Sequence, residues 1–294
     1  MRAHGGRRGV LMRVGLSLRW YAYNHGLSHP RFFASMPAVS LSVALITHNE
    51  RSNIAACLES VSFADEWIVV DSGSTDGTVE IARSMGATVI EVKEWPGFGR
   101  QKNRALSHAT GDWILSIDAD ERVTPELKQS ILAATSSCET ALAYDFQRLS
   151  RFCGQWMRHG DWYPDRVTRL FRKGQGRFTD DYVHERLQVD VGTKCLKGHL
   201  LHETMPTLDD ALAKMNRYSS GRALDKVQAG HSGGLSVALL HGAWAFIRSY
   251  FIRRGFLDGR LGLVLALYIA EGTYYRYLKM AVLSGSLGQA GEPS

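Results

Sequence analysis

Residues 41–50 read LSVALITHNE, and residues 66–78 read EWIVVDSGSTDGT. Each segment begins as a short apolar run and ends in polar residues, which is typical of a buried parallel strand followed by a surface loop. Between the two runs, Ile54, Leu58 and Val61 have the spacing of one helix face. The stretch therefore predicts a strand, a helix and a second strand in succession.

The same alternation continues to about residue 135. We expect a helix that begins with Ser74 or Thr75 as its cap and stops at Gly86, and a second helix over residues 101–109. Further strands are expected over residues 87–92 and 113–118. Alternating strands and helices favour an α/β fold, a mostly parallel sheet with helices on both faces. Ligands of such sheets bind at the carboxyl ends of the strands.

Polar residues gather at those carboxyl ends. The first strand is followed by Asn49 and Glu50, the second ends in Asp71, and residues 113–121 read WILSIDADE. Nearby carboxylates such as Asp118 and Asp120 repel each other unless a cation lies between them. Because oxygen ligands suit Mg²⁺ or Mn²⁺, the pattern favours a divalent metal that holds a diphosphate. The alternative is that the acidic run caps the helix that begins at Thr124-Pro125.

The order of these motifs resembles the family 2 glycosyltransferases with the GT-A fold. The matching segments are residues 47–50 (THNE), 71–78 (DSGSTDGT), 102–104 (KNR) and 118–121 (DADE). Later segments are similar to the branch that includes lipopolysaccharide inner-core sugar transferases: residues 162–165 (WYPD), 169–171 (RLF), 183–185 (VHE), 198–202 (GHLLH) and 255–259 (GFLDG). The sequence departs from the family at Ser72, where a second Asp is common.

The resemblance implies a nucleotide-sugar site. Thr47, Asn49, Glu50 and Asp71 would line the pocket for the base and ribose, with Asp71 accepting the imide N–H of uracil. Lys102 would contact Asp71 or the diphosphate, unless it is a solvated lysine on a helix face.

The resemblance also implies a site for Mg²⁺ or Mn²⁺. Asp120 would hold the metal, and Asp118 would contact the metal or the ribose. His202 would be a third metal ligand or a diphosphate contact, although a lone histidine is often structural.

The implied reaction transfers a hexose, with glucose as our guess, from a nucleotide-diphosphate sugar such as a UDP-hexose, and inverts the anomeric carbon. The implied acceptor is a lipid-linked glycan of the lipopolysaccharide core or a similar cell-envelope glycan. Glu185 is the expected general base, and its rivals are Asp161, Asp165, Asp180 and Asp181. Two other functions stay open: a polyprenyl-phosphate sugar synthase and a non-catalytic membrane-associated protein with the same fold.

Charge and hydropathy divide the chain into three parts. Residues 1–40 hold six arginines and no acidic residue, which leaves 29 basic and 29 acidic residues in the rest of the chain. We expect residues 1–40 to be a poorly ordered basic extension and not a signal peptide. Residues 41–205 would be the catalytic domain, with a nucleotide-binding half at 41–135 and an acceptor half at 136–205. A neutral body gives no reason to expect a nucleic-acid partner.

Residues 206–294 are expected to be helical and to contact a membrane surface. A helix should begin after Pro206, because Thr207 and Asp210 have the spacing of a capping box. The later apolar and basic segments suggest amphipathic helices at a membrane surface. The runs 235–247 and 261–270 are shorter than the ~18 residues of a membrane span. Four scattered cysteines without a C-x-x-C pair suggest reduced thiols and a cytoplasmic protein. Together with the expected membrane contact, this predicts a peripheral protein on the inner face of the cytoplasmic membrane.

Overall fold

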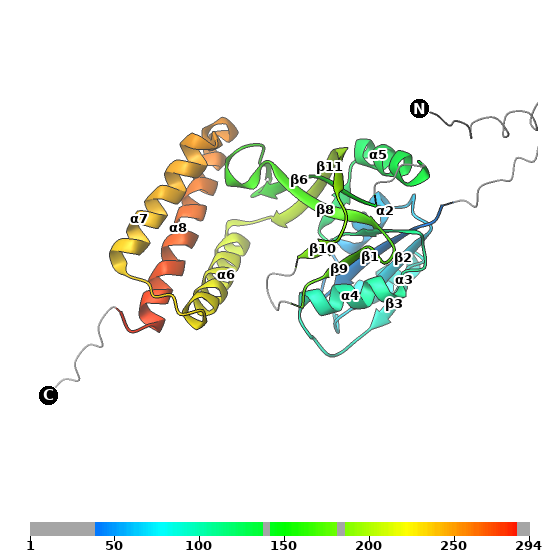
Figure 1. Cartoon of the computed structure of the whole chain (residues 1–294), viewed down its shortest axis with the longest axis horizontal. Helices are drawn as coiled ribbons and strands as arrows, with labels where there is room; N and C mark the ends of the chain where they lie inside the picture. The colour runs from blue at the N-terminus through cyan, green and yellow to red at the C-terminus, as the bar shows by residue number, and fades with distance from the viewer. Residues whose placement is uncertain (1–38, 138–141, 181–185, 287–294) are drawn as a thin grey trace, which may run out of the picture. The chain divides into compact units, whose positions relative to one another are not determined.

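The computed structural model describes residues 39–137, 142–180 and 186–286. The expected basic extension falls almost wholly outside these residues. In the described part the main sheet has the order β3-β2-β1-β4-β8-β6-β11-β5, and a short strand β7 (Gln155–Trp156) pairs with β6 (Figure 1). The fold is the expected α/β fold, and the first half of its main sheet is parallel.

Four parallel strands form the first half of the sheet: β1 (Leu41–Thr47), β2 (Glu66–Asp71), β3 (Thr88–Glu91) and β4 (Trp113–Ser116). Strand β1 is buried along almost its whole length, and its successive side chains enter two different cores. Val43 and Leu45 pack with one set of helices, whereas Ala44 packs on the other face. Burial on both faces explains why these strands read as continuous apolar runs.

Helices cover both faces of this half. α2 (Ile54–Ser60), α3 (Thr78–Ser84) and α5 (Pro125–Ser136) contribute to the core on one face, and α4 (Phe98–His108) contributes to the core on the other. The expected cap of α3 at Ser74 or Thr75 is wrong. The helix begins at Thr78, because the Ser74 side chain donates to Asp71 and the Asp76 carboxylate accepts the Thr78 N–H.

The second half of the sheet is mostly antiparallel. It contains β5 (Glu121–Val123), β6 (Ala143–Phe152), β8 (Asp165–Arg172) and β11 (Thr193–Met205). Strand β8 joins the two halves, since it pairs antiparallel with both β4 and β6. A short 3₁₀ turn η1 (Gly160–Trp162) precedes β8, and a separate hairpin pairs β9 (Gly176–Phe178) with β10 (Leu187–Val189).

Three helices complete the described chain: α6 (Leu208–Gln228), α7 (Leu235–Ile247) and α8 (Gly259–Leu283). The predicted capping box of α6 is present, with Thr207 and Asp210 bonded reciprocally. Buried Asp258 links the helices to the sheet region, because its carboxylate accepts the backbone N–H groups of Arg158 and His159.

The prediction that the apolar run at residues 235–247 is too short to span a membrane is wrong. The helix continues from α7 through a π-helical turn η2 (Arg248–Ile252), and a 3₁₀ turn η3 (Gly255–Asp258) follows before α8. In the described chain, the stretch Leu235–Ile252 is long and apolar enough to cross a membrane on length and composition alone, and 22% of it is buried. Because α7 also packs along α8, the same length and hydropathy suit a helix that packs on its own protein.

Candidate active site

A cavity of about 1500 Å³ opens at the carboxyl ends of β1 and β4. Its lining includes six of the predicted site residues, which come from elements far apart in the sequence: Thr47, Glu50, Lys102, Asp118, Asp120 and His202. The position agrees with the rule that open α/β sheets bind ligands at their carboxyl edge.

Two cations hold Asp118 at the floor of this cavity. Lys102 Nζ lies 2.9 Å from one carboxylate oxygen, and Arg169 Nη2 lies 2.8 Å from the other. Burial alone would raise the pKa of Asp118, but Arg169 and Lys102 outweigh burial and hold the pKa well below its usual range. Asp118 is therefore an ionised and fixed carboxylate.

Arg169 joins this pair to a second buried carboxylate, Glu121. The Arg169 guanidinium lies 3.1 Å from Glu121 Oε1, and Arg148 approaches the same oxygen at 3.4 Å. Glu121 Oε2 accepts the backbone N–H of Asp118 at 2.9 Å. Since Glu121 has no exposed surface and Arg169 only 7%, the network fixes the turn that carries the acidic motif.

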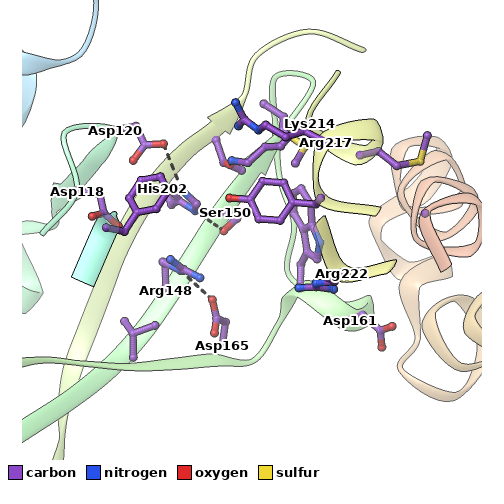
Figure 2. Close-up of a pocket in the computed structure, with 18 of the residues that line it drawn as sticks. Asp118, Asp120, Arg148, Ser150, Asp161, Asp165, His202, Lys214, Arg217 and Arg222 are labelled. Atoms are coloured by element: carbon purple, nitrogen blue, oxygen red, sulfur yellow. Dashed lines mark hydrogen bonds and ion pairs between the residues drawn. The ribbon is translucent and has the colours of Figure 1, made fainter. Parts of the chain in front are cut away.

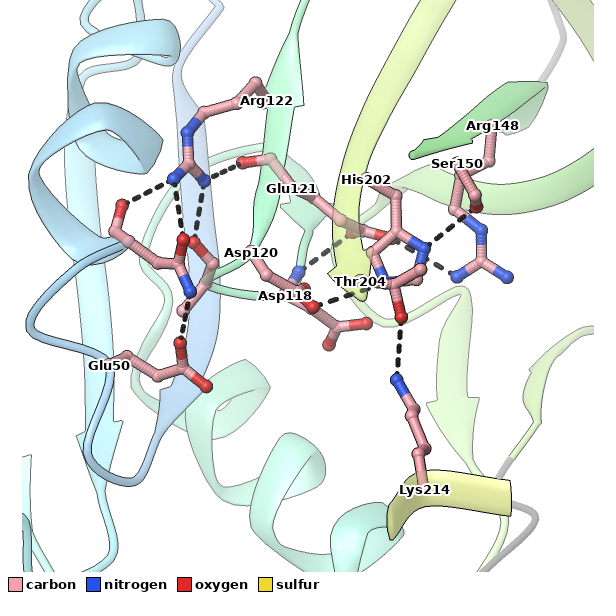
Figure 3. Close-up of polar contacts among 12 residues, drawn as sticks. Glu50, Asp118, Asp120, Glu121, Arg122, Arg148, Ser150, His202, Thr204 and Lys214 are labelled. Carbon is pink, nitrogen blue, oxygen red and sulfur yellow. Dashed lines mark hydrogen bonds and ion pairs between the residues drawn. The ribbon is translucent and has the colours of Figure 1, made fainter. Parts of the chain in front are cut away.

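Asp120 points toward a histidine from a distant strand. Its Oδ2 lies 3.3 Å from His202 Nε2, and His202 Nδ1 lies 3.0 Å from the Ser150 hydroxyl, as Figure 3 shows. The sheet register makes this contact, because His202 on β11 is paired with Glu121 on one side and with Ser150 on the other. A lone histidine in the sequence thus lies beside the acidic motif in the fold.

This pair fits a small divalent cation. Two ligands about 2.1 Å from one octahedral ion are roughly 3 Å apart, close to the observed 3.3 Å. The described residues contain no group of three His, Cys, Asp or Glu side chains able to hold a metal. A cation here would take one carboxylate oxygen and one imidazole nitrogen from the protein and would complete its shell with substrate phosphates and water.

The loop after β2 is organised by Asp71. Its two carboxylate oxygens accept from the Thr47 hydroxyl, the backbone N–H groups of Gly73 and Ser74, and the Ser74 hydroxyl. Asp71 is only 1% exposed, so in this conformation it holds the loop beside the cavity and does not face the cavity itself.

Asn49 ties the end of β1 to the same loop. Its backbone N–H donates to the Ser74 hydroxyl, and its side-chain oxygen accepts the N–H of Thr75. The residue has a left-handed φ of 57°, a conformation that asparagine tolerates better than most residues. Like Asp71, Asn49 does not line the cavity.

Comparison with known proteins agrees with this geometry. The model of the family described as glycosyl transferase family 2 matches residues 42–191. An uncharacterized glycosyltransferase of Rickettsia prowazekii is 34% identical over 256 residues, which cover 83% of this chain and 87% of that protein. The chain belongs to glycosyl transferase family 2. It is a glycosyltransferase with the GT-A fold, as its motifs indicated.

A further relative of this family 2 enzyme carries a more specific name. The lipopolysaccharide core biosynthesis glycosyltransferase LpsC of Rhizobium meliloti is 29% identical, with 82% of this chain and 94% of LpsC covered. Among solved structures, glucosyl-3-phosphoglycerate synthase from Mycobacterium tuberculosis, in complex with Mn²⁺ and UDP, is 29% identical. The match covers 39% of this chain and 45% of that one, with a TM-score of 0.33.

In the glycosyltransferase, the described site residues that were predicted fall into two groups. Six of them line the cavity, whereas Asn49 and Asp71 do not line it and instead hold the loop after β2. Lys102 is not a solvated lysine, since it is 6% exposed and paired with Asp118. Burial, followed by the nearby charges of Asp120, Asp118 and Asp76, raises the pKa of Glu50, although a hydrogen bond from Asn53 opposes the shift. Glu185 and Asp181 lie outside the described residues.

Sequence reasoning missed the roles of two residues of the transferase. Arg169 was noted only as part of a family motif, and Glu121 only as part of the acidic run, yet together they position Asp118. The available signal was the charge of Arg169 directly before the apolar residues Leu170 and Phe171 of β8, where burial requires a partner.

Proposed function

We propose that the enzyme transfers a hexose from a nucleotide-diphosphate sugar, a UDP-hexose, to a cell-envelope glycan acceptor, with a divalent metal and with inversion. The observation that carries this proposal is the Asp120–His202 pair beside ion-paired Asp118, at the carboxyl edge of the sheet. Residues 41–205 would be the catalytic domain, with the nucleotide on the 41–135 half and the acceptor on the 136–205 half.

Asp120 and His202 would hold the Mg²⁺ or Mn²⁺. When bound, the metal would neutralise charge on the departing nucleoside diphosphate. The Ser150 hydroxyl keeps the His202 ring in place, with Nε2 facing Asp120. Lys102 and Arg169 keep Asp118 charged and immobile, so that it is ready to contact the ribose or the metal.

Asp71 and Asn49 would shape the base and ribose pocket indirectly. Their hydrogen bonds fix residues 73–75 against the end of β1, and Thr47 and Glu50 then line the opening itself. A uracil N–H could reach Asp71 only if one of its present donors moved away, because all four are protein groups.

Glu185 is our proposed general base, which would take the proton of the acceptor hydroxyl in a single displacement. The rival carboxylates in the described cavity are already engaged: Asp161 pairs with Arg248 at 2.5 Å, and Asp165 with Arg148 at 2.8 Å. Ion pairing lowers the basicity of a carboxylate, which makes these two poorer proton acceptors. A direct displacement needs no covalent sugar–enzyme intermediate, unlike the retaining hydrolases.

The glycan acceptor is proposed from the likeness to LpsC, whose name places it in lipopolysaccharide core biosynthesis. A lipid-linked acceptor fits the exposed apolar surface of the helices in the 206–294 region. Leu240 is 71% exposed, Ile252 59% and Phe251 56%, and Arg253 and Arg254 follow directly. Apolar side chains beside arginines suit the surface of an anionic membrane. We therefore place the enzyme on the inner face of the cytoplasmic membrane as a peripheral protein.

The donor proposal is tested by UDP release. UDP-glucose, UDP-galactose and UDP-N-acetylhexosamines are supplied one at a time, with Mn²⁺ or with EDTA, and the UDP released as water accepts the sugar is measured. We expect metal-dependent release from one UDP-hexose in the wild type and its loss in Asp120→Asn. Metal-independent release, or equal release by the variant, would contradict the proposed metal site. Absence of release and of UDP binding would favour a non-catalytic protein.

The general base is tested with Glu185→Gln. The variant should bind UDP as the wild type does but should lose about 10²–10⁴-fold in transfer rate. Asp180→Asn is the matched control, because Asp180 is an exposed carboxylate five residues upstream whose nearest described cation is 3.8 Å away. Normal turnover by Glu185→Gln would remove Glu185 from this role.

Membrane contact is tested by co-sedimentation with vesicles of phosphatidylglycerol and phosphatidylcholine at low salt. The wild type should pellet with the vesicles, and a variant with Leu240→Ser, Phe251→Ser and Ile252→Ser should stay in the supernatant. Equal behaviour of the two proteins would show that this apolar surface does not bind lipid.

A further inference from the structure

Asp118, Asp120 and His202 form one end of the cavity, called here the acidic corner. The cavity extends well beyond this corner, to a second end lined by α6, α7 and α8. Half of the ten described cations along its walls have a carboxylate partner. Arg166 lies 2.7 Å from Asp145, and Arg148, Arg169 and Arg248 have the partners described above. A different situation is found on α6, where three basic residues face the cavity: Lys214, Arg217 and Arg222 (Figure 2).

These three α6 residues have no carboxylate within ion-pair distance among residues 39–137, 142–180 and 186–286. Lys214 donates to the Thr204 hydroxyl at 2.7 Å, and the Arg217 guanidinium lies 5.7 Å from the ring centre of its neighbour Tyr218. Cations that share a cavity wall repel one another, so an unpaired group of this kind favours an anion.

The position of Lys214 adds a second observation. Burial lowers its pKa, and the nearby cations Arg217 and Arg148 lower it further, while Asp120 and Asp118 act in the opposite direction. When an ammonium is partly buried and its partner is a neutral hydroxyl, the loss of hydration of its positive charge is incompletely compensated. Lys214 lies at the end of the α6 cations (Lys214, Arg217 and Arg222, the stripe) that is nearest the acidic corner. An anion bound there would supply the charged partner that the Lys214 ammonium lacks.

The stripe is too long for the donor phosphates to contact all of it. Lys214 and Arg222 are eight residues apart on one helix, which corresponds to ~12 Å along the helix axis. A diphosphate bound at the Asp120–His202 corner could reach Lys214 at most, and Arg222 would lie beyond it. A ligand of Arg222 would therefore have to be a group other than the donor diphosphate.

Resting on the proposed function, we propose that Arg217 and Arg222, with Lys214 at the junction, bind an anionic substituent of the acceptor glycan, a phosphate or a carboxylate. Arginine suits both groups, because its planar guanidinium donates two parallel hydrogen bonds. The aromatic residues Tyr218, Trp244 and Tyr268 line the same end and offer flat surfaces for a sugar ring. The enzyme would thus select acceptors that carry negative charge near the reacting sugar.

The test uses glucose 6-phosphate as the anionic probe and glucose as its uncharged match. Binding of each is measured by calorimetry on the full chain, with and without saturating UDP and Mn²⁺. We expect the wild type to bind glucose 6-phosphate at least about tenfold more tightly than glucose. The double variant Arg217→Gln/Arg222→Gln should lose this preference, and Arg217→Lys/Arg222→Lys should retain part of it.

Lys226→Gln is the matched control, since Lys226 is an exposed cation on the same helix that does not line the cavity. It should keep the wild-type preference. An equal affinity of the wild type for the two sugars, or a preference that survives in the double glutamine variant, would overturn the proposal. Weaker UDP–Mn²⁺ binding by the double variant would also overturn it, because the cations would then belong to the donor site. Failure of the wild type to bind UDP would instead refute the proposed function, while the probe arm without UDP still decides this inference.

Discussion

Replacing Arg169 by Met is the most informative perturbation of the fold around the site. Arg169 is 7% exposed, and its guanidinium contacts both Asp118, at 2.8 Å, and Glu121, at 3.1 Å. Removing one partner of a buried ion pair typically costs 3–5 kcal/mol, because the remaining charge is left without compensation. Here Lys102 still faces Asp118 and Arg148 still faces Glu121, so we expect the lower end, about 3 kcal/mol.

The assay is equilibrium unfolding in urea at pH 7 and at lower pH. Because the folded pKa of Asp118 lies below its ordinary value, the ionised carboxylate contributes stability above an unfolded pKa of about 3.9 and loses it as the pH falls. Removing Arg169 takes away part of this contribution. The stability difference between wild type and variant should therefore shrink as the pH falls below about 4.

Arg83→Met is the matched control for this experiment. Arg83 pairs with Glu91 at 2.5 Å, but both side chains are more than half exposed, so the substitution should cost less than about 1 kcal/mol. The reasoning would be refuted if Arg169→Met cost no more than Arg83→Met, or if its cost did not depend on pH.

Three further predictions concern stability and are checked by the same unfolding assay. Gly198→Ala should cost at least about 2 kcal/mol, because Gly198 has φ +96° and a new Cβ would lie 2.3 Å from the Leu127 backbone nitrogen; an unchanged stability would refute this close approach. Thr207→Ala removes the cap of α6 and should cost about 1 kcal/mol, and no loss would mean that the capping box is not formed. Asp258→Ala leaves the N–H groups of Arg158 and His159 without their acceptor and should cost about 3 kcal/mol, whereas a loss below ~1 kcal/mol would show that water replaces the carboxylate.

The parallel half of the fold could be predicted from the sequence because its strands are buried on both faces. The strands predicted at the apolar starts of residues 41–50 and 66–78 are observed as β1 and β2. The start of α3 could not be predicted from local propensity. Ser74 is a good cap by itself, but the Asp71 carboxylate competes for its hydroxyl across the loop.

The antiparallel half was difficult for a different reason. Strand β6 contains Asp145, Arg148 and Arg151, which interrupt its apolar pattern, and the sequence alone shows no clear strand there. In the fold each charge meets a partner on a neighbouring strand, such as Arg166 for Asp145 and Glu203 for Arg151. Cross-strand ion pairs thus replaced the apolar alternation on which strand prediction depends.

The candidate site was predictable where motif residues follow strands, as for Asp118 and Asp120. The partners of those residues were not, because they depend on sheet register. His202 reaches Asp120 through the pairing of β11 with β5, and Arg169 reaches Asp118 from β8. Neither pairing can be read from spacing along the chain.

The affinity for UDP with and without Mn²⁺, measured by calorimetry, tests the central claim most directly. The account predicts that Mn²⁺ strengthens UDP binding to the wild type by at least about tenfold, or ~1.4 kcal/mol. This gain should disappear in Asp120→Asn and in His202→Ala, and should survive in Asp180→Asn. Equal UDP affinity with and without Mn²⁺ in the wild type, or a full metal effect in Asp120→Asn, would contradict the account.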